Sequence, residues 1–229
     1  NARIYLEQRG MPGEIVERYR LGYAPDPDQA GWNYLSDRLS AKTLSGEIIE
    51  QAGLAVKNDR GGLYDRFRSR IMFPINDMTG RVVAFGGRIL GDGQPKYMNS
   101  PESPIFEKSR LLFGLQQHRQ AIRQARRALV VEGNFDLLSL ATHGIDNVVA
   151  PLGTALTRIH IQSLRSYSRE VVLVFDADAA GLKAAMRSIP FLLAERMDGR
   201  VALLPAGHDP DSFVREQGPD AVAELVQAA

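Results

Sequence analysis

The sequence contains no cysteine in its 229 residues. That absence excludes disulfide bonds, thiolate zinc sites and a cysteine nucleophile from this chain, and it is compatible with a reducing compartment. The apolar runs fall short of the roughly 18 residues that a bilayer-spanning helix requires, and the first residues do not form the apolar core of a signal peptide. We therefore expect a soluble, cytoplasmic protein with no membrane partner.

Two catalytic motifs are also missing. Without a Gly-x-x-x-x-Gly-Lys-Ser/Thr motif the chain does not encode a P-loop ATPase, and without a Gly-x-Ser-x-Gly elbow a Ser-His-Asp hydrolase has no support. The sequence starts with Asn1 in a helical pattern and stops at Ala229 in another. We therefore expect it to be a piece of a longer protein.

Charge is nearly balanced along the whole chain, with 28 Lys plus Arg against 27 Asp plus Glu, but it is unevenly distributed. Residues 57–127 carry 14 basic and 6 acidic side chains, whereas residues 128–229 carry a net charge of −5. Of the 28 cations, 23 are Arg, whose planar guanidinium matches phosphate oxygens in bidentate geometry. The basic stretch therefore favours polyanionic partners.

The two halves of the chain follow different patterns, and we place their boundary near residue 126. Residues 1–126 combine short helical patterns with a β-hairpin, in which strands at 71–75 and 81–85 flank a loop that ends in Gly80. This half is expected to form an α+β subdomain.

Residues 127–229 alternate between strand and helix. We expect strands at 128–131, 147–150, 171–175 and 201–204, and helices at 135–142, 158–167, 182–196 and 211–227. This order is typical of an α/β domain with a mostly parallel sheet covered by helices on both faces. The chain as a whole is therefore expected to be an α/β protein of two subdomains, 1–126 and 127–229.

Carboxylates follow three of the expected parallel strands. They are Glu132 and Asp136 after the first strand, Asp176 and Asp178 after the third, and Asp209 and Asp211 after the fourth. Ligands in such sheets bind outside the carboxyl ends of the strands. Clustered carboxylates raise one another's pKa unless a cation neutralises them, and oxygen-only ligands suit Mg²⁺ or Mn²⁺ better than zinc. The pattern predicts a divalent-metal site.

Some of these acids also have a simpler interpretation. Asp178 and Asp211 each precede a helix and are candidates for its N-cap. Glu132 follows an apolar strand directly and has no capping partner of that kind, so it favours the metal site. His208, a single histidine beside acidic residues, is weak evidence for a ligand or a base.

The motifs Glu132-Gly133-x-x-Asp136, Asp176-x-Asp178 and Asp209-Pro210-Asp211 together resemble the Toprim domain. With three upstream segments, at 64–75, 80–88 and 95–102, nearly the whole chain resembles the catalytic core of DnaG-type bacterial DNA primases. The resemblance implies a DNA-directed RNA polymerase that makes short RNA primers on single-stranded DNA from nucleoside triphosphates.

The same resemblance assigns roles to the acids and names partners. Glu132, Asp176 and Asp178 would be the catalytic metal ligands, supported by Asp209, Asp211 and Asp136. The cofactor would be Mg²⁺ or Mn²⁺, in a two-metal nucleotidyl transfer. The product would be an RNA–DNA hybrid made at the bacterial replication fork. Zinc would belong to a preceding domain and the replicative helicase to a following one, both outside this chain.

Seven basic residues are candidates for binding the template backbone or the triphosphate: Arg66, Arg68, Arg70, Arg88, Lys96, Lys108 and Arg110. The first three alternate along an expected extended stretch, so their side chains would share one face. Phe67 and Tyr97 are candidates for stacking on bases, although Phe67 also suits packing. The alternative is a solvated, charged edge strand.

Two other functions stay open on the sequence alone. A Toprim nuclease or topoisomerase would use the same metals to cleave a phosphodiester bond. A non-catalytic module would bind one metal and hold single-stranded DNA through its basic residues.

Overall fold

The computed structural model describes residues 2–229, apart from the side chain of Ala180. The chain forms two compact units, and each is described by itself. The first unit consists of the residues up to Gln8 and of Val16–Glu107, and the second of Arg9–Ile15 and Lys108–Ala229. The units divide earlier than the boundary expected near residue 126, because helix α6 (Leu115–Ala125) packs on strands of the second unit.

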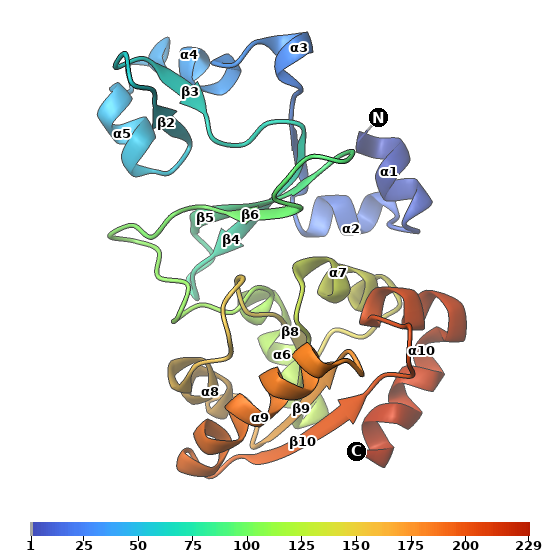
Figure 1. The fold of residues 1–229 in the computed structure, drawn as a ribbon. Coiled ribbons are helices and arrows are strands. Elements are labelled where there is room, and N and C mark those ends of the chain that lie inside the picture. Colours follow the sequence, from blue (N-terminus) through green and yellow to red (C-terminus); the bar gives the residue numbers. More distant parts are fainter. Residues whose placement is uncertain (1) are drawn as a thin grey trace. The chain divides into compact units, whose positions relative to one another are not determined.

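The first unit is built around a four-stranded antiparallel sheet of order β1-β4-β5-β6, with β2 and β3 as a separate antiparallel pair (Figure 1). Its strands are β1 (Gly22–Ala24), β2 (Ala55–Lys57), β3 (Leu63–Asp65), β4 (Arg70–Asn76), β5 (Val82–Ile89) and β6 (Tyr97–Asn99). Its helices are α1 (Ala2–Gln8), α3 (Pro27–Ala30), α4 (Tyr34–Ser40) and α5 (Gly46–Gln51), and α2 (Gly13–Arg18) crosses from the second unit into the first.

The hairpin expected from the sequence is confirmed as β4 and β5. Alternate residues of β4 fill the core, since Ile71, Phe73 and Ile75 are almost completely buried. Phe73 lies opposite Gly86 of β5, and a Cβ built on Gly86 would come within 1.9 Å of the Phe73 ring. Only glycine therefore fits at this point of the hairpin.

The second unit contains the parallel sheet that the alternating pattern predicted. Its order is β10-β9-β7-β8, and all three neighbouring pairs are parallel. The strands are β7 (Arg127–Val130), β8 (Val148–Val149), β9 (Glu170–Phe175) and β10 (Asp198–Leu203). The helices are α6, α7 (Asn134–Thr142), α8 (Arg158–Arg165), α9 (Ala179–Ala194) and α10 (Pro210–Ala228).

Helices cover both faces of this sheet. Right-handed crossovers that leave β7 and β9 in opposite directions place α7 and α9 on opposite faces. Helix α10 packs with α7, and α8 packs with α9 (Figure 1). The five residues 171–175 of β9 are all buried, as expected of a strand covered on both sides.

Element boundaries differ from the expectation where the apolar pattern carries little information. Helix α9 begins at Ala179 rather than at 182, because Asp178 caps it. Strand β10 begins at the polar residue Asp198 rather than at 201, because it lies at the edge of the sheet and need not be apolar there. Strands β1, β2, β3 and β6, each of three residues, were too short to be recognised in the sequence.

In the part of the chain that the structure describes, no helix combines the length and the apolar composition needed to cross a bilayer.

The contact between Gly86 and Phe73 gives a prediction about stability. Gly86→Ala forces the Phe73 ring out of its place, and overpacking of this kind costs roughly 1–3 kcal/mol of unfolding free energy. Gly13→Ala is the control, because Gly13 begins α2 with open space around its Cα. Urea unfolding followed by circular dichroism measures both variants. Equal midpoints for Gly86→Ala and the unsubstituted chain would contradict the packing described here.

Candidate active site

The order of the parallel sheet defines where a ligand would bind. The connection from β7 runs toward β8, whereas the connection from β9 runs toward β10, so the direction reverses between the neighbouring strands β7 and β9. Ligands bind in the crevice outside the carboxyl ends of the strands at such a switch point. Glu132 follows β7, and Asp176 follows β9 directly. Glu132 and Asp176 therefore lie on opposite sides of this crevice.

The segment between β9 and α9 holds the next carboxylate. Asp178 is the N-cap of α9, and its Oδ1 accepts a hydrogen bond of 2.7 Å from the Gly181 N–H. A Cβ on Gly181 would come within 2.3 Å of the Asp176 carbonyl oxygen, so glycine allows the first turn of α9 to approach the end of β9. The capping role considered for Asp178 is confirmed.

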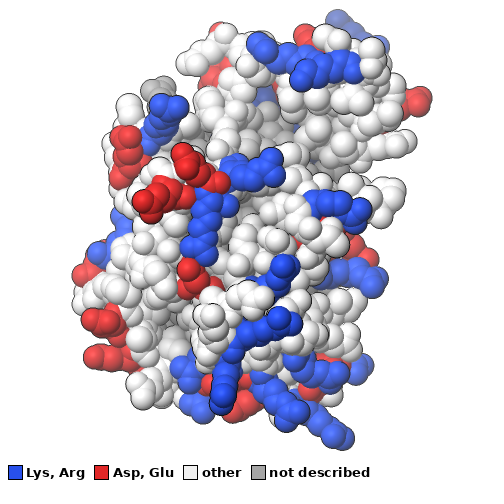
Figure 2. Space-filling model, turned by 180° about the vertical axis from the view of Figure 1, so that it is seen from behind, with Lys and Arg blue, Asp and Glu red and all other residues white. Residues whose placement is uncertain are grey.

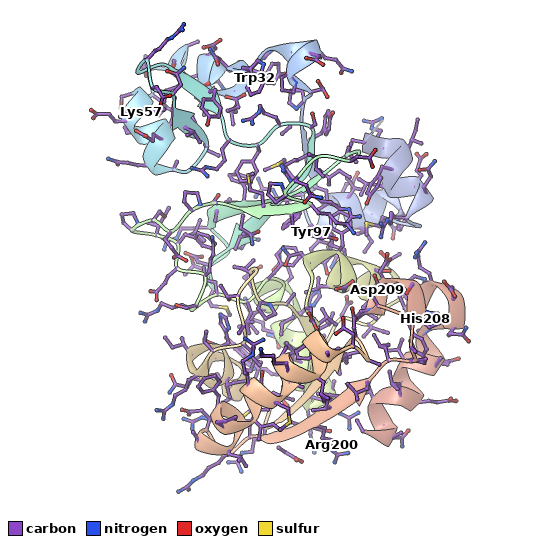
Figure 3. The ribbon with its side chains drawn as sticks, viewed as in Figure 1. Trp32, Lys57, Tyr97, Arg200, His208 and Asp209 are labelled. Carbon is purple, nitrogen blue, oxygen red and sulfur yellow. The ribbon has the colours of Figure 1, made fainter. Side chains whose placement is uncertain are left out.

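At the start of α10 the helix is capped by a different acid from the one considered for that role. Asp209, not Asp211, is the N-cap: it accepts a hydrogen bond of 2.7 Å from the Ser212 N–H, and the Ser212 hydroxyl accepts one of 3.0 Å from the Asp209 N–H. Figure 3 labels Asp209 at this end of α10 and Arg200 on β10, toward the opposite end of the sheet. The neighbouring His208 ring packs edge-on against Phe213, at 5.7 Å between centroids.

Asp211 is buried and already paired with two arginines of the chain. Its carboxylate pairs with Arg9 and, at 3.2 Å, with Arg215 one helical turn later. A carboxylate held by two guanidinium groups is a poorer metal ligand than one without a cation. Asp211 therefore acts first as the anchor of Arg9 and Arg215 within the second unit.

Asp136 lies in the first turn of α7, where its carboxylate accepts a hydrogen bond of 3.0 Å from the Gly133 N–H. Its pKa is raised from 3.8 to about 8 by burial and by the charges on Asp209, Asp176 and Asp211, against which the Gly133 hydrogen bond acts. Acids that follow β9 and β10 are therefore close enough to act together on Asp136, which follows β7.

The pKa values of Glu132, Asp176 and Asp209 also respond to burial and to neighbouring charges. Partial burial and the charges of Asp176 and Asp178 raise the pKa of Glu132, and burial with the charges of Asp209 and Asp178 raises that of Asp176. Burial also acts to raise the pKa of Asp209, but the hydrogen bonds from Ser212 and the charges on Arg9 and Arg215 outweigh it, so that this pKa is lowered.

The donor set fits a hard divalent cation. It consists of carboxylate oxygens alone, with no cysteine and with His208 turned to Phe213, which suits Mg²⁺ or Mn²⁺. Among residues 2–229, no three acidic or histidine side chains converge in a preformed ligand set. The burial of the acids and their mutual electrostatic effects, rather than a finished coordination shell, therefore define the site.

Two of the basic residues predicted to bind nucleic acid are buried in the first unit. Arg70 donates a hydrogen bond of 2.8 Å to the Pro95 carbonyl. Arg88 donates to the hydroxyls of Tyr5 and Tyr97, and its guanidinium lies over both rings. The structure therefore gives both arginines an internal role in holding neighbouring loops.

The stretch that carries Arg66 and Arg68 is not extended, contrary to expectation. Strand β3 ends at Asp65, β4 starts at Arg70, and Ser69 between them has a φ of 51°. Side chains at alternate positions therefore do not share one face. Arg66 and Arg68 are half-buried, whereas Lys96 and Arg110 are exposed and Lys108 is half-buried.

The aromatic candidates divide by exposure. Phe67 is buried, so it packs in the core rather than stacking on a base, whereas 43% of Tyr97 is exposed. A role for Tyr97 in binding nucleic acid stays a prediction.

A surface that the sequence analysis missed surrounds Arg68. Its guanidinium lies 4.7 Å from the ring centroid of Trp32 and 5.2 Å from that of Tyr64, and the two rings meet edge to face at 6.3 Å. Trp32, labelled in Figure 3, is 58% exposed by its accessible surface. We call Trp32, Tyr64 and Arg68 the Trp32 platform. Its only signal in the sequence is that Trp32 is the single tryptophan.

The arginines that hold Asp211 were also missed. Arg215 follows Asp211 by four residues on one helix, a spacing that could have indicated the pair. Arg9 comes from the other end of the chain, and no local pattern connects the two.

Surface charge on one face of the second unit differs from the net negative charge of residues 128–229. Figure 2 shows Lys and Arg side chains gathered on one face of the second unit, in the lower part of the view. The acidic excess of residues 128–229 is therefore not what this face presents.

Comparison with known proteins identifies the family. A model described as the DNA primase catalytic core, N-terminal domain, matches residues 1–119, and a Toprim-like model matches residues 129–214. The chain belongs to the DnaG family of DNA primases. The two matches lie on either side of residue 126, and the Toprim match spans all of the acids from Glu132 to Asp211. Membership implies the use of divalent metal ions.

Curated primases resemble the chain over its whole length. The DNA primase of Legionella pneumophila is 46% identical over 98% of the chain, and that of Escherichia coli K12 is 43% identical over 100%. The chain spans only 38% and 39% of the lengths of these two proteins.

Solved primase structures share its fold. The Escherichia coli primase catalytic core has a TM-score of 0.92 at 43% identity, covering 100% of the chain and 72% of that core. A DnaG primase catalytic domain bound to single-stranded DNA has a TM-score of 0.92 at 42% identity, with 100% and 73% coverage. The α/β class predicted for the chain is therefore confirmed.

The raised pKa of Asp136 predicts how stability depends on pH in metal-free buffer. Between 3.8 and about 8 the folded chain keeps a proton that the unfolded chain has released, so this group makes the free energy of unfolding fall as pH rises through that interval. Asp136→Asn keeps an acceptor for the Gly133 N–H and removes the titration. We expect the variant to gain stability relative to the unsubstituted chain between about pH 5 and pH 8. Chemical denaturation in EDTA at several pH values gives the free energy of unfolding of both proteins. Curves of this free energy against pH that run parallel for the variant and the unsubstituted chain would contradict the prediction.

Proposed function

We propose that the chain is the part of a bacterial primase that joins ribonucleotides into short RNA primers on single-stranded DNA. The observation that carries the proposal is the cluster of Glu132, Asp136 and Asp176 at the switch point of the parallel sheet, where the pKa of each acid is raised by burial and by its neighbours. The primase-core and Toprim-like matches support this reaction. Nucleotidyl transfer uses divalent cations to neutralise the charge on the phosphates, and clustered acids are suited to hold such cations.

We assign Glu132 and Asp176 as the main metal ligands, with Asp178 beside them. Asp209 and Asp136 support the site, and Asp211 contributes least because Arg9 and Arg215 already hold it. Mg²⁺ or Mn²⁺ bound there would neutralise the triphosphate and lower the pKa of the attacking 3′-hydroxyl. The carboxylates supply the negative potential that attracts the ions, and the caps at Gly181 and Ser212 fix two of them in orientation.

We propose that the first unit binds the template strand. The Trp32 platform offers an exposed indole for base stacking and a guanidinium for phosphate, the combination used in single-strand grooves. Lys96 and Arg66 add cations, and Lys108 and Arg110 are candidates for the triphosphate or template backbone. A similar DnaG domain has been solved with single-stranded DNA, and the Mycobacterium tuberculosis domain with a double-stranded oligomer carrying an overhang.

Family membership supports a proposal about the context of the reaction. The product would be an RNA–DNA hybrid made from nucleoside triphosphates at the replication fork, in the bacterial cytoplasm. Contact with the replicative helicase would belong to the part of the curated relatives that this chain does not span. The primase-core match of residues 1–119 favours synthesis over cleavage by a Toprim nuclease or topoisomerase.

Primer synthesis tests the assignment. Glu132→Gln and Asp176→Asn remove the charges that would hold the metal, and we expect each to lower incorporation of labelled ribonucleotides on a single-stranded template by about 100-fold or more. The control is Asp198→Asn, at the exposed amino end of β10.

Template affinity is measured on the same proteins. If Glu132→Gln and Asp176→Asn retain DNA binding and cannot synthesise primers, the acids act in the chemistry. Failure of both binding and synthesis would favour a non-catalytic DNA-binding module. Equal amounts of RNA primer from the unsubstituted chain and all three variants would contradict the catalytic assignment of Glu132 and Asp176.

The salt dependence of binding tests the cations. Lys96→Ala or Arg66→Ala should weaken single-strand binding and flatten the plot of log affinity against log salt concentration by about 0.7 for every phosphate that is no longer bound. Arg81→Ala is the control, because Arg81 pairs with Asp77 in the β4–β5 turn. Fluorescence anisotropy of a labelled oligonucleotide at several salt concentrations gives the slopes. Slopes unchanged from the unsubstituted chain would argue against phosphate binding at these positions.

A further inference from the structure

Asp65 is a buried residue that is hydrogen-bonded to two members of the Trp32 platform, Trp32 and Arg68. It is 4% exposed, and its carboxylate accepts three hydrogen bonds from the start of α4: from the Leu35 N–H at 2.6 Å, the Ser36 N–H at 2.9 Å and the Ser36 hydroxyl at 2.8 Å. The N-cap residue of that helix, Asn33, makes no side-chain hydrogen bond to it. A carboxylate from β3 therefore performs the capping that the helix's own sequence does not supply.

The backbone of Asp65 holds the two ends of the platform. Its N–H donates a hydrogen bond of 2.8 Å to the Trp32 carbonyl, and its carbonyl accepts one from Arg68. Tyr64, the third member of the platform, is the preceding residue in β3. Every element of the platform is therefore bonded to Asp65 or adjacent to it.

The carboxylate of Asp65 is needed because no other side chain of similar shape can accept all three of these hydrogen bonds. An amide at this position has one acceptor oxygen, and its NH₂ group would face N–H donors. A buried donor left without a partner costs more than the bond itself contributed. Removing the charge would therefore loosen the start of α4, and Trp32 lies just before that helix.

We propose that Asp65 is a positioning residue for template binding. Through the cap on α4 and its backbone bonds it holds the Trp32 indole and the Arg68 guanidinium in the arrangement that receives a single strand. The proposal rests on the proposed function and deepens it, since it names a residue that acts through Trp32 without touching DNA.

The single tryptophan makes the test specific, because all tryptophan emission comes from position 32. Asp65→Asn should change the emission and the acrylamide quenching of Trp32 in the free protein. It should also weaken binding of a labelled oligothymidylate by about tenfold, which is the scale of stacking on one base. Asp77→Asn is the matched control: Asp77 also accepts several hydrogen bonds, from Thr79 and Arg81, but in the β4–β5 turn. It should leave both readouts unchanged.

A double-mutant cycle separates positioning from general structural damage. If Asp65 acts through the indole, Asp65→Asn should cost less than about twofold in a Trp32→Ala background, since no indole is present there to stack on a base. The same tenfold weakening in both backgrounds would overturn the proposal, and so would a folded Asp65→Asn protein with unchanged emission and affinity.

Ser36→Ala tests the positioning role of Asp65 if Asp65→Asn fails to fold. It removes one of the three donors and should weaken binding by about threefold, again only in the presence of Trp32. An affinity equal to that of the unsubstituted chain would overturn the proposal. Failure of the proposed function has a different signature: the unsubstituted chain would bind the oligonucleotide and show the cycle, yet make no primer.

Discussion

The burial and mutual repulsion of carboxylates at the carboxyl edge of the parallel sheet are the constraint on which the second unit depends. Strands β7, β9 and β10 deliver acids to one edge, and the fold compensates several of them internally. Asp178 and Asp209 cap helices, while Arg9 and Arg215 hold Asp211. The pKa values of Glu132, Asp136 and Asp176 stay raised. A divalent cation bound among these three acids would favour their deprotonated, charged forms.

The sequence predicted this edge well because its signals are local and periodic. Apolar strands followed at once by Glu132 and Asp176 indicate both the parallel sheet and the position of the acids relative to it. The capping of α10 by Asp209 rather than Asp211 was not predictable in the same way. Either acid suits an N-cap, and the choice depends on Arg9, whose contact with α10 joins distant parts of the sequence.

The first unit was harder to predict, because its elements are short and its charged residues have internal partners. A run of alternating arginines suggested an extended ridge, but Ser69 in the left-handed region breaks the alternation and Arg70 turns inward. The Trp32 platform is held instead by Asp65, a buried acid of β3 whose carboxylate accepts hydrogen bonds from the start of α4. Such a cap across distant segments leaves no periodic trace in the sequence.

Anomalous diffraction from crystals soaked in Mn²⁺ tests most directly whether the acidic edge is a metal site. We expect a manganese peak coordinated by carboxylate oxygens of Glu132 and Asp176, at the switch point between β7 and β9, and its disappearance in crystals of Glu132→Gln. Clear manganese peaks elsewhere on the protein, with none between these two side chains, would contradict it.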